Sequence, residues 1–348
     1  GSGFKYPPTQ SNALYHGSLM IGDATTRVSD NAYGSDVWPY SYDFTTLEDG
    51  ELQFSSSAEV DQLGAAAFDD SEVPIGQQVG VVVTQTSYAW ADTPNDDYVI
   101  VQFNVTNTDV NPKEDLYVGL YMDWDVQAYS DNEADWDASR ALGYVFNGQQ
   151  IPPNPNYYGT ALLSPDPASY RVISQFVELT DAQKYDYMSA GFVQTSSSGP
   201  NDQATLLAAG PFSIPAASSI EVVFAVLGGN DLDDLQTNAD AAAAKWLEIG
   251  QQTLQPSPNP SKRFEITSAF PRPANDAVRL NLYLPAPGIV QFDAIDLLGR
   301  TIPLQQVTYG TAGEKTHSIN YWTGASGIYF IRASSPFGSA VTKILWLK

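Results

Sequence analysis

The sequence predicts a mainly β protein: a large jelly-roll-like β-sandwich with one helix, followed by a small immunoglobulin-like β-sandwich. Short apolar segments with a period of two alternate with turn residues along most of the chain. Only one long segment has helical composition, and a Pro-rich segment divides an acidic body from a basic tail. We therefore expect an acidic β-sandwich module at 1–253, a linker at 254–262 and a second β-sandwich at 263–348.

The charge changes abruptly at the linker. Residues 1–253 contain 7 Lys and Arg against 35 Asp and Glu, whereas residues 254–348 contain 9 against 5. This excess of carboxylates opposes binding to nucleic acid or to anionic membranes, and it favours divalent cations. No apolar run approaches the roughly 18 residues of a membrane span. The chain has no cysteine, which excludes disulfides, thiolate metal sites and a cysteine nucleophile.

Seven segments of the body have the pattern of strands. In the clearest, 97–106, apolar side chains occupy every second position from Val99 to Val105. Polar turns separate it from its neighbours, 78–90 and 116–124, so we expect these three to form an antiparallel meander. The other predicted strands are 140–147, 161–164, 170–176 and 220–227.

The helix is expected at 231–249. Asn230 or Asp231 caps its start, and acidic residues follow where the helix dipole is positive. An Ala-rich centre has high helix propensity, and Gly250 is expected to end the helix.

The tail shows the strongest period-two pattern of the chain. Apolar residues alternate with polar ones from Val278 to Leu284, and prolines then start a turn. Further strands are expected at 289–298, 327–333 and 341–347. Short strands at this spacing predict an immunoglobulin-like sandwich.

Four sequence features of the tail belong together: Pro271-Arg272-Pro273, the Asp-Leu-Leu-Gly-Arg turn at 296–300, the Gly-Ile-Tyr-Phe strand at 327–330, and a basic end with Lys343 and Lys348. With them the tail resembles the type A C-terminal sorting domain of proteins exported by the type IX secretion system, although that family usually has asparagine where Arg272 stands. The resemblance implies recognition by the type IX machinery through residues 263–348. It also implies a location outside the cell, or on the outer cell surface of a diderm bacterium. That family needs a signal peptide for the first export step, so Gly1 is expected to be a mature start or the edge of a fragment.

The body carries a second resemblance. The segments YVGLYMDWDV (117–126), RALGYVFN (140–147) and AAGPFSIPAASSIEVVFAVLGGNDLDDL (208–235) are similar to a non-catalytic, β-rich region of large type IX cargo proteins. This resemblance implies an accessory secreted module.

An acidic loop at 123–137 is the best candidate for chemistry. Asp123 and Asp125 project to the same side of a strand end, about 7 Å apart. The loop is expected to return further oxygen ligands toward them: Asp131, Asn132, Glu133, Asp135 and Asp137. Such a density of hard oxygen ligands suits Ca²⁺, although the spacing is not that of an EF-hand. The alternative is a solvated acidic loop without a bound ion.

Catalysis has little support in the sequence. Asp123 and Asp125 resemble a glycosidase pair with Trp124 and Trp136 as sugar platforms, but no carboxylate is set apart in an apolar surrounding. The two histidines, His16 and His317, fall in different predicted domains, which opposes a zinc site or a Ser-His-Asp triad. We therefore expect no enzyme, but a secreted or cell-surface protein with a scaffolding role.

Aromatic clusters at 38–42, 157–158 and 185–187 leave two alternatives open. Exposed rings would suit a surface glycan or self-association, whereas buried rings would fill the core. Self-association would make the chain a subunit of an extracellular filament or surface layer, and glycan binding would make it a glycan-binding module. A further alternative is an accessory part of a larger secreted hydrolase.

Overall fold

The computed structural model describes residues 3–32, 42–48, 50–57, 59–149, 156–174, 179–253, 264–275, 277–284, 288–297, 299–311, 313–320, 325–335 and 338–347. The protein is mainly β, with 56% strand and 10% helix in several antiparallel sheets, as the sequence predicts. It divides into two compact units. The body unit comprises Gly1–Thr45, Leu52–Ala65 and Asp69–Gln255, and the tail unit comprises Thr46–Glu51, Ala66–Phe68 and Pro256–Lys348. The predicted linker, 254–262, lies outside the described residues.

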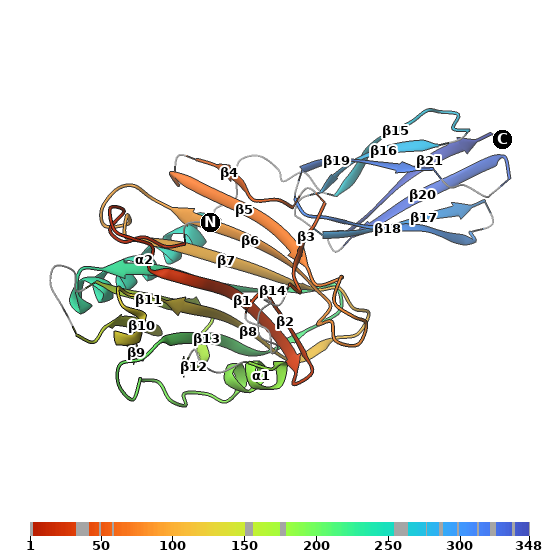
Figure 1. Cartoon of the computed structure of the whole chain (residues 1–348). Coiled ribbons are helices and arrows are strands. Elements are labelled where there is room, and N and C mark those ends of the chain that lie inside the picture. Colours follow the sequence, from red (N-terminus) through yellow and green to blue (C-terminus); the bar gives the residue numbers. More distant parts are fainter. Residues whose placement is uncertain are drawn as a thin grey trace. The chain divides into compact units, whose positions relative to one another are not determined.

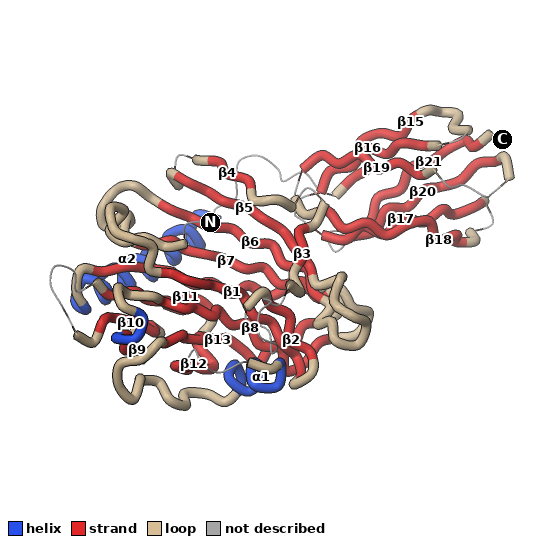
Figure 2. Tube along the Cα trace, viewed as in Figure 1, coloured by secondary structure: helices blue, strands red, loops and turns tan. Residues whose placement is uncertain are grey.

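The body unit is built on two sheets (Figures 1 and 2). The five-stranded sheet has the order β12 (Pro167–Ser174), β13 (Gln203–Ile214), β8 (Lys113–Trp124), β1 (Leu14–Ala24), β2 (Arg27–Asp30), and all its neighbours are antiparallel. The nine-stranded sheet has the order β3 (Thr45–Thr46), β5 (Gln62–Asp69), β6 (Val81–Ala89), β7 (Tyr98–Asn107), β14 (Ser219–Gly229), β11 (Tyr157–Ser164), β10 (Leu142–Asn147), β9 (Asn132–Asp137), with β4 (Gln53–Ser55) beside β5.

The predicted meander is wrong in its third strand. β6 and β7 pair as expected, but β8 pairs with β1 and β13 in the other sheet. The side chain of Asn107 helps to explain this crossing, because its Nδ2 donates to the carbonyl oxygens of Asn111 and Ile214, both at 2.9 Å. Seven consecutive residues at the end of β8 are buried, so this strand is covered on both faces.

Helices cover the outer faces of the sheets. α1 (Asp181–Ser189) packs against the strands of the five-stranded sheet, and α2 (Leu232–Thr253) packs against β14, β11 and β7. Between the sheets, the ring of Trp124 stacks on that of Tyr158 with 5.4 Å between centroids. Each fully buried large apolar side chain of this kind stabilises the fold by about 1.5–3 kcal/mol.

The helices differ from expectation in two ways. α2 begins as predicted, with Asp231 Oδ1 accepting from the backbone N–H of Asp234 at 2.9 Å, but it continues past Gly250 to Thr253. α1 is not expected from the sequence. A capping box between Thr180 and Gln183 starts it, and its buried face contains a lysine, Lys184, which gives it no clear apolar stripe.

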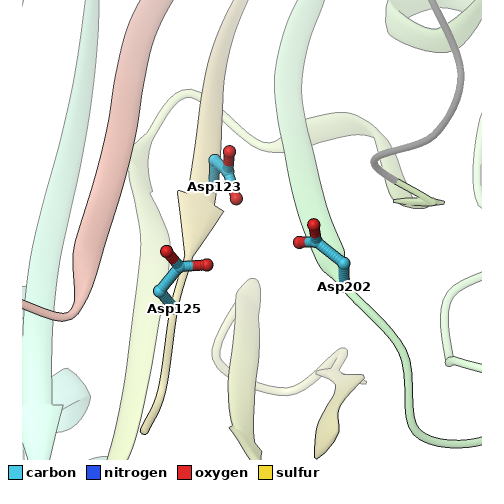
Figure 3. A group of neighbouring side chains, drawn as sticks. All are labelled: Asp123, Asp125 and Asp202. Carbon is cyan, nitrogen blue, oxygen red and sulfur yellow. The ribbon is translucent and has the colours of Figure 1, made fainter. Parts of the chain in front are cut away.

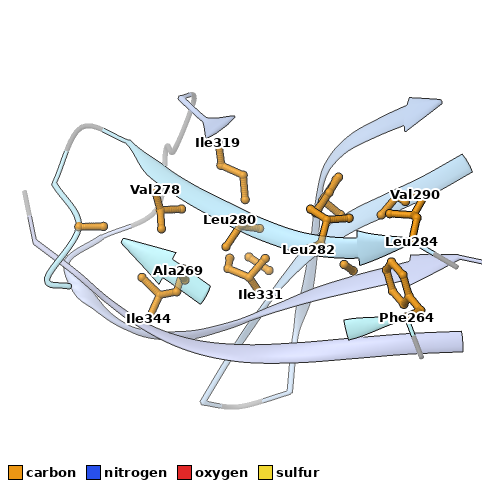
Figure 4. Close-up of a cluster of buried hydrophobic side chains, with 14 of the residues drawn as sticks. Phe264, Ala269, Val278, Leu280, Leu282, Leu284, Val290, Ile319, Ile331 and Ile344 are labelled. Atoms are coloured by element: carbon orange, nitrogen blue, oxygen red, sulfur yellow. The ribbon is translucent and has the colours of Figure 1, made fainter. Parts of the chain in front are cut away.

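The tail unit contains two further antiparallel sheets. One has the order β15 (Glu265–Phe270), β16 (Val278–Leu284), β19 (Gly313–Ile319), and the other β18 (Thr301–Tyr309), β17 (Gly288–Asp296), β20 (Gly327–Ser335), β21 (Gly338–Trp346). The alternation predicted for β16 is confirmed, because its four apolar side chains are fully buried (Figure 4). β18 and β19 were not predicted, and β19 contributes two buried side chains, His317 and Ile319, of which Ile319 belongs to the core cluster.

Candidate metal centre

Three aspartates converge where β8 ends and β13 begins. Asp123 and Asp125 are two residues apart, which places them on one side of the chain. In the antiparallel register Ala204 lies opposite Asp123, so continuing the pairing by two residues brings Asp202 opposite Asp125. One ligand oxygen of each carboxylate lies within 4.8 Å of those of the other two. Figure 3 shows the carboxylates of Asp125 and Asp202 pointing toward one another.

Burial and mutual repulsion raise the energy of the charged cluster. Asp123 is 3% exposed. Burial raises the pKa of Asp125, and burial together with the charge of Asp125 raises the pKa of Asp202 to about 6. Asp202 Oδ1 is buried and has no hydrogen-bond partner among the described residues. A cation between the three groups would offset the repulsion between the carboxylates, because it neutralises their charge. It would also give the unpartnered oxygen of Asp202 a partner.

Asn132 orders the loop beside this centre. Its Oδ1 accepts from the backbone N–H of Val126 at 2.9 Å, and its Nδ2 donates to the carbonyl oxygens of Val126 at 2.8 Å and Ala128 at 3.2 Å. The backbone N–H of Asn201 donates to the carbonyl oxygen of Asn132 at 2.9 Å. Asn132 therefore positions both strand ends, and its amide oxygen is engaged in that role.

The other predicted ligands lie outside the group of three. Asp131 closes the short helix η1 (Tyr129–Asp131), whereas Glu133, Asp135 and Asp137 follow along β9. Asp135 is exposed and accepts from the backbone N–H of Trp136. Asp137 pairs with Arg140 at 2.9 Å. Burial opposes its ionisation, but hydrogen bonds from Ser139 and Arg140 outweigh that effect and lower the pKa of Asp137.

The arrangement suits a hard divalent cation. Ca²⁺ takes six to eight oxygens, and three carboxylates supply three to six of them, which leaves places for water. Asp123, Asp125 and Asp202 would hold the ion. Sequence reasoning missed Asp202, because it lies far along the chain, directly before a strand, β13, that was not predicted.

The rings proposed as sugar platforms do not form an open surface. Trp124 is fully buried. Trp136 stacks on Tyr170 at 4.7 Å between centroids, with Phe192 at 5.4 Å. The predicted cluster at 157–158 is buried as well, and the two tyrosines of the cluster at 185–187 pack beside the core under α1. Of the cluster at 38–42, only Tyr42 is among the described residues, and it is 69% exposed.

The two histidines lie in separate units. His16 Nε2 is 3.0 Å from the carbonyl oxygen of Asn31, and burial lowers the pKa of His16. His317 is 8% exposed and stacks on Phe292 with 4.2 Å between centroids. Neither histidine is among the three residues of the acidic centre.

Neither helix is long and apolar enough, within the described residues, to cross a membrane. No curated protein matches the chain. Among solved structures, a polysaccharide lyase is similar over 99% of this chain, with 9% identity and a TM-score of 0.32; the chain spans 41% of that protein. Residues 268–346 match the family described as secretion system C-terminal sorting domain. The tail is thus a secretion system C-terminal sorting domain, and its presence supports the identification of the protein as type IX secretion cargo.

Proposed function

We propose that the body unit is a non-catalytic extracellular module that bound calcium stabilises after export, and that it serves a scaffolding role at the outer cell surface. One observation carries the calcium part of this proposal: Asp123, Asp125 and Asp202 bring their carboxylates within 4.8 Å of one another. Three negative charges at this distance repel each other strongly unless a cation lies between them.

Calcium would act as a stabilising ligand. An ion that binds the folded chain and not the unfolded one stabilises it by about 2.7 kcal/mol at a hundredfold excess over its dissociation constant. Extracellular modules bind Ca²⁺ with dissociation constants of about 10⁻⁴–10⁻³ M, and the absence of cysteine leaves no disulfide for the same purpose. The ion would join the ends of β8 and β13, which are neighbouring strands at the centre of the five-stranded sheet.

The proposal that the body unit is non-catalytic rests on the structural contacts made by its titratable side chains. Two side chains that could serve acid–base chemistry are engaged in structure: His16 contacts the Asn31 backbone, and Asp137 is held by Arg140. The filament and glycan-binding alternatives stay predictions. The burial of the aromatic residues at 157–158 removes one argument for them.

Thermal unfolding of the full chain tests the calcium site. We expect Ca²⁺ to raise the melting temperature of the body unit by several degrees above its value in EDTA, and Mg²⁺ to raise it less. Asp202→Asn should abolish this response. Asp135→Asn, which alters an exposed carboxylate outside the centre, should retain it. Equal melting temperatures in Ca²⁺ and EDTA for the unaltered protein would contradict the proposal.

A further inference from the structure

Lys184 and Asp30 form a buried pair between α1 and β2. Lys184 Nζ lies 2.8 Å from Asp30 Oδ2, and the two side chains are 2% and 0% exposed. They are 154 positions apart in the sequence. The pair therefore connects the edge strand of the five-stranded sheet to the helix that covers it.

Apolar side chains pack around this pair, and the carboxylates of Asp43 and Asp181 also lie close enough to interact with it. Buried hydrophobic side chains under α1 form one cluster, which includes Met20, Val28, Ala32, Tyr121, Leu179 and Met188. Burial raises the pKa of Asp30 to about 6, although the charge of Lys184 and its hydrogen bond act in the opposite direction. A low dielectric disfavours separated charges, and the raised pKa of Asp30 favours the carboxylic acid form of its side chain. Condensation requires the form of the pair in which the proton lies on Asp30, because a neutral, desolvated lysine amine is a nucleophile.

Each oxygen of the Asp30 carboxyl group has its own hydrogen-bond donor. Its Oδ1 accepts from the backbone N–H of Ala32 at 2.8 Å, and such a donor stabilises the negative charge that develops on a carbonyl oxygen. Its Oδ2 faces Lys184. Asp43 lies beside this group, because Asp43 Oδ2 accepts from the backbone N–H of Asp30 at 3.1 Å.

We propose that Lys184 and Asp30 condense to an intramolecular isopeptide bond. The lone pair of Nζ attacks Cγ of the protonated Asp30, and Oδ1 takes up the negative charge beside the N–H of Ala32. When the C=O bond re-forms, the bond from Cγ to Oδ2 breaks. Oδ2 leaves with its own proton and one from Nζ as a single water molecule, and the product is a secondary amide. No oxidant, reductant or cofactor takes part.

Physical proximity drives the reaction. Well-oriented intramolecular reactions have effective concentrations of about 10⁵–10⁸ M, and burial keeps solvent water from reversing the condensation. The amide would tie β2 to α1 as a disulfide ties two segments, by limiting the freedom of the unfolded chain. A chain without cysteine gains in this way a covalent link that needs no oxidising partner.

The mass of the denatured full chain tests this proposal. We expect a mass lower than that of the sequence by one water molecule. A tryptic digest should contain the peptide that begins at Val28 joined to the one that begins at Val172, with no cleavage after Lys184. A full chain with the mass of its sequence, and cleavage after Lys184, would overturn the proposal.

Two variants assign the bond to this lysine. Lys184→Met should have the mass of its own sequence, whereas Lys113→Met, which removes another buried, ion-paired lysine, should still lose one water. A water loss that persists in Lys184→Met would also overturn the assignment. Because the bond is covalent and is read after denaturation, the mass of the unaltered protein decides the question even if Lys184→Met folds poorly.

Discussion

The backbone N–H of Asn201 donates to the carbonyl oxygen of Asn132 at 2.9 Å, and this contact lies next to the acidic centre. Asn132 begins β9, and Asn201 precedes Asp202 and β13. The side chain of Asn132 also holds the loop that follows Asp125. The side chain and the backbone of Asn132 therefore contact both chain segments that supply the carboxylates.

Replacement of Asn132 by alanine should weaken the fold at this point. Asn132→Ala leaves the backbone N–H of Val126 without its acceptor, which costs about 1–3 kcal/mol if this group stays buried. The carbonyl oxygens of Val126 and Ala128 each lose one donor but keep another, Asn147 Nδ2 and the N–H of Asp131 respectively. We expect a lower free energy of unfolding in urea and weaker calcium binding. Ser130→Ala, an exposed change in the same loop, should alter neither. An unchanged denaturation midpoint in Asn132→Ala would show that the amide is dispensable.

The pH dependence of stability should report on Asp202. Its pKa in the fold is about 6, against 3.8 ordinarily, so the folded chain holds a proton that the unfolded chain has released between these values. In EDTA, this group should therefore destabilise the fold as pH rises from about 4 to 6. The difference in melting temperature between wild type and Asp202→Asn isolates the effect. Calcium affinity should fall below about pH 6, because protonated Asp202 is a poorer ligand. A difference that does not vary with pH would contradict this assignment.

Asp70 anchors the start of β6, and its removal should be severely destabilising. Asp70 is 2% exposed, and its carboxylate accepts from the backbone N–H groups of Val79, Gly80 and Val81 and from the hydroxyl of Ser29. Asp70→Ala leaves all four donors without this acceptor, so we expect a loss of about 3 kcal/mol or more in the free energy of unfolding. Glu72→Ala, at a nearby exposed carboxylate, is the matched control. Urea denaturation measures both, and equal midpoints would refute the prediction.

His317 should make the tail unit sensitive to acid. Burial lowers the pKa of His317 below 6.5, so the unfolded chain binds a proton more readily than the folded chain does. Stability should be fully present above pH 6.5 and should fall as pH drops from 6.5 toward the folded pKa. Hydrogen exchange of the β16 and β17 amides should accelerate with acid more in wild type than in His317→Leu, once the intrinsic pH effect is subtracted. The same acid response in both proteins would exclude His317 as the cause.

A folded tail should be required for export. Leu280 is fully buried in the tail core, and an aspartate there would leave an unpaired charge among apolar side chains (Figure 4). We expect Leu280→Asp to keep the protein inside the cell envelope, measured by immunoblotting of cell and medium fractions. Val341→Asp, at a residue that is 55% exposed, should leave export unchanged. Normal export of Leu280→Asp would mean that recognition does not depend on this core.

The sequence by itself determined the local features of this protein. The period-two pattern of β16 predicted its buried face, the motifs of the tail predicted the sorting domain, and composition placed α2. In each case neighbouring residues carry the whole pattern. The tertiary structure alone decided which strands became partners. It moved β8 to the second sheet, brought Asp202 to Asp125, and buried Lys184 against Asp30. A carboxylate or a lysine has the same identity in the sequence whether it is solvated or buried. Only the pairing of distant segments, driven by burial of the apolar faces, determines which polar groups meet inside.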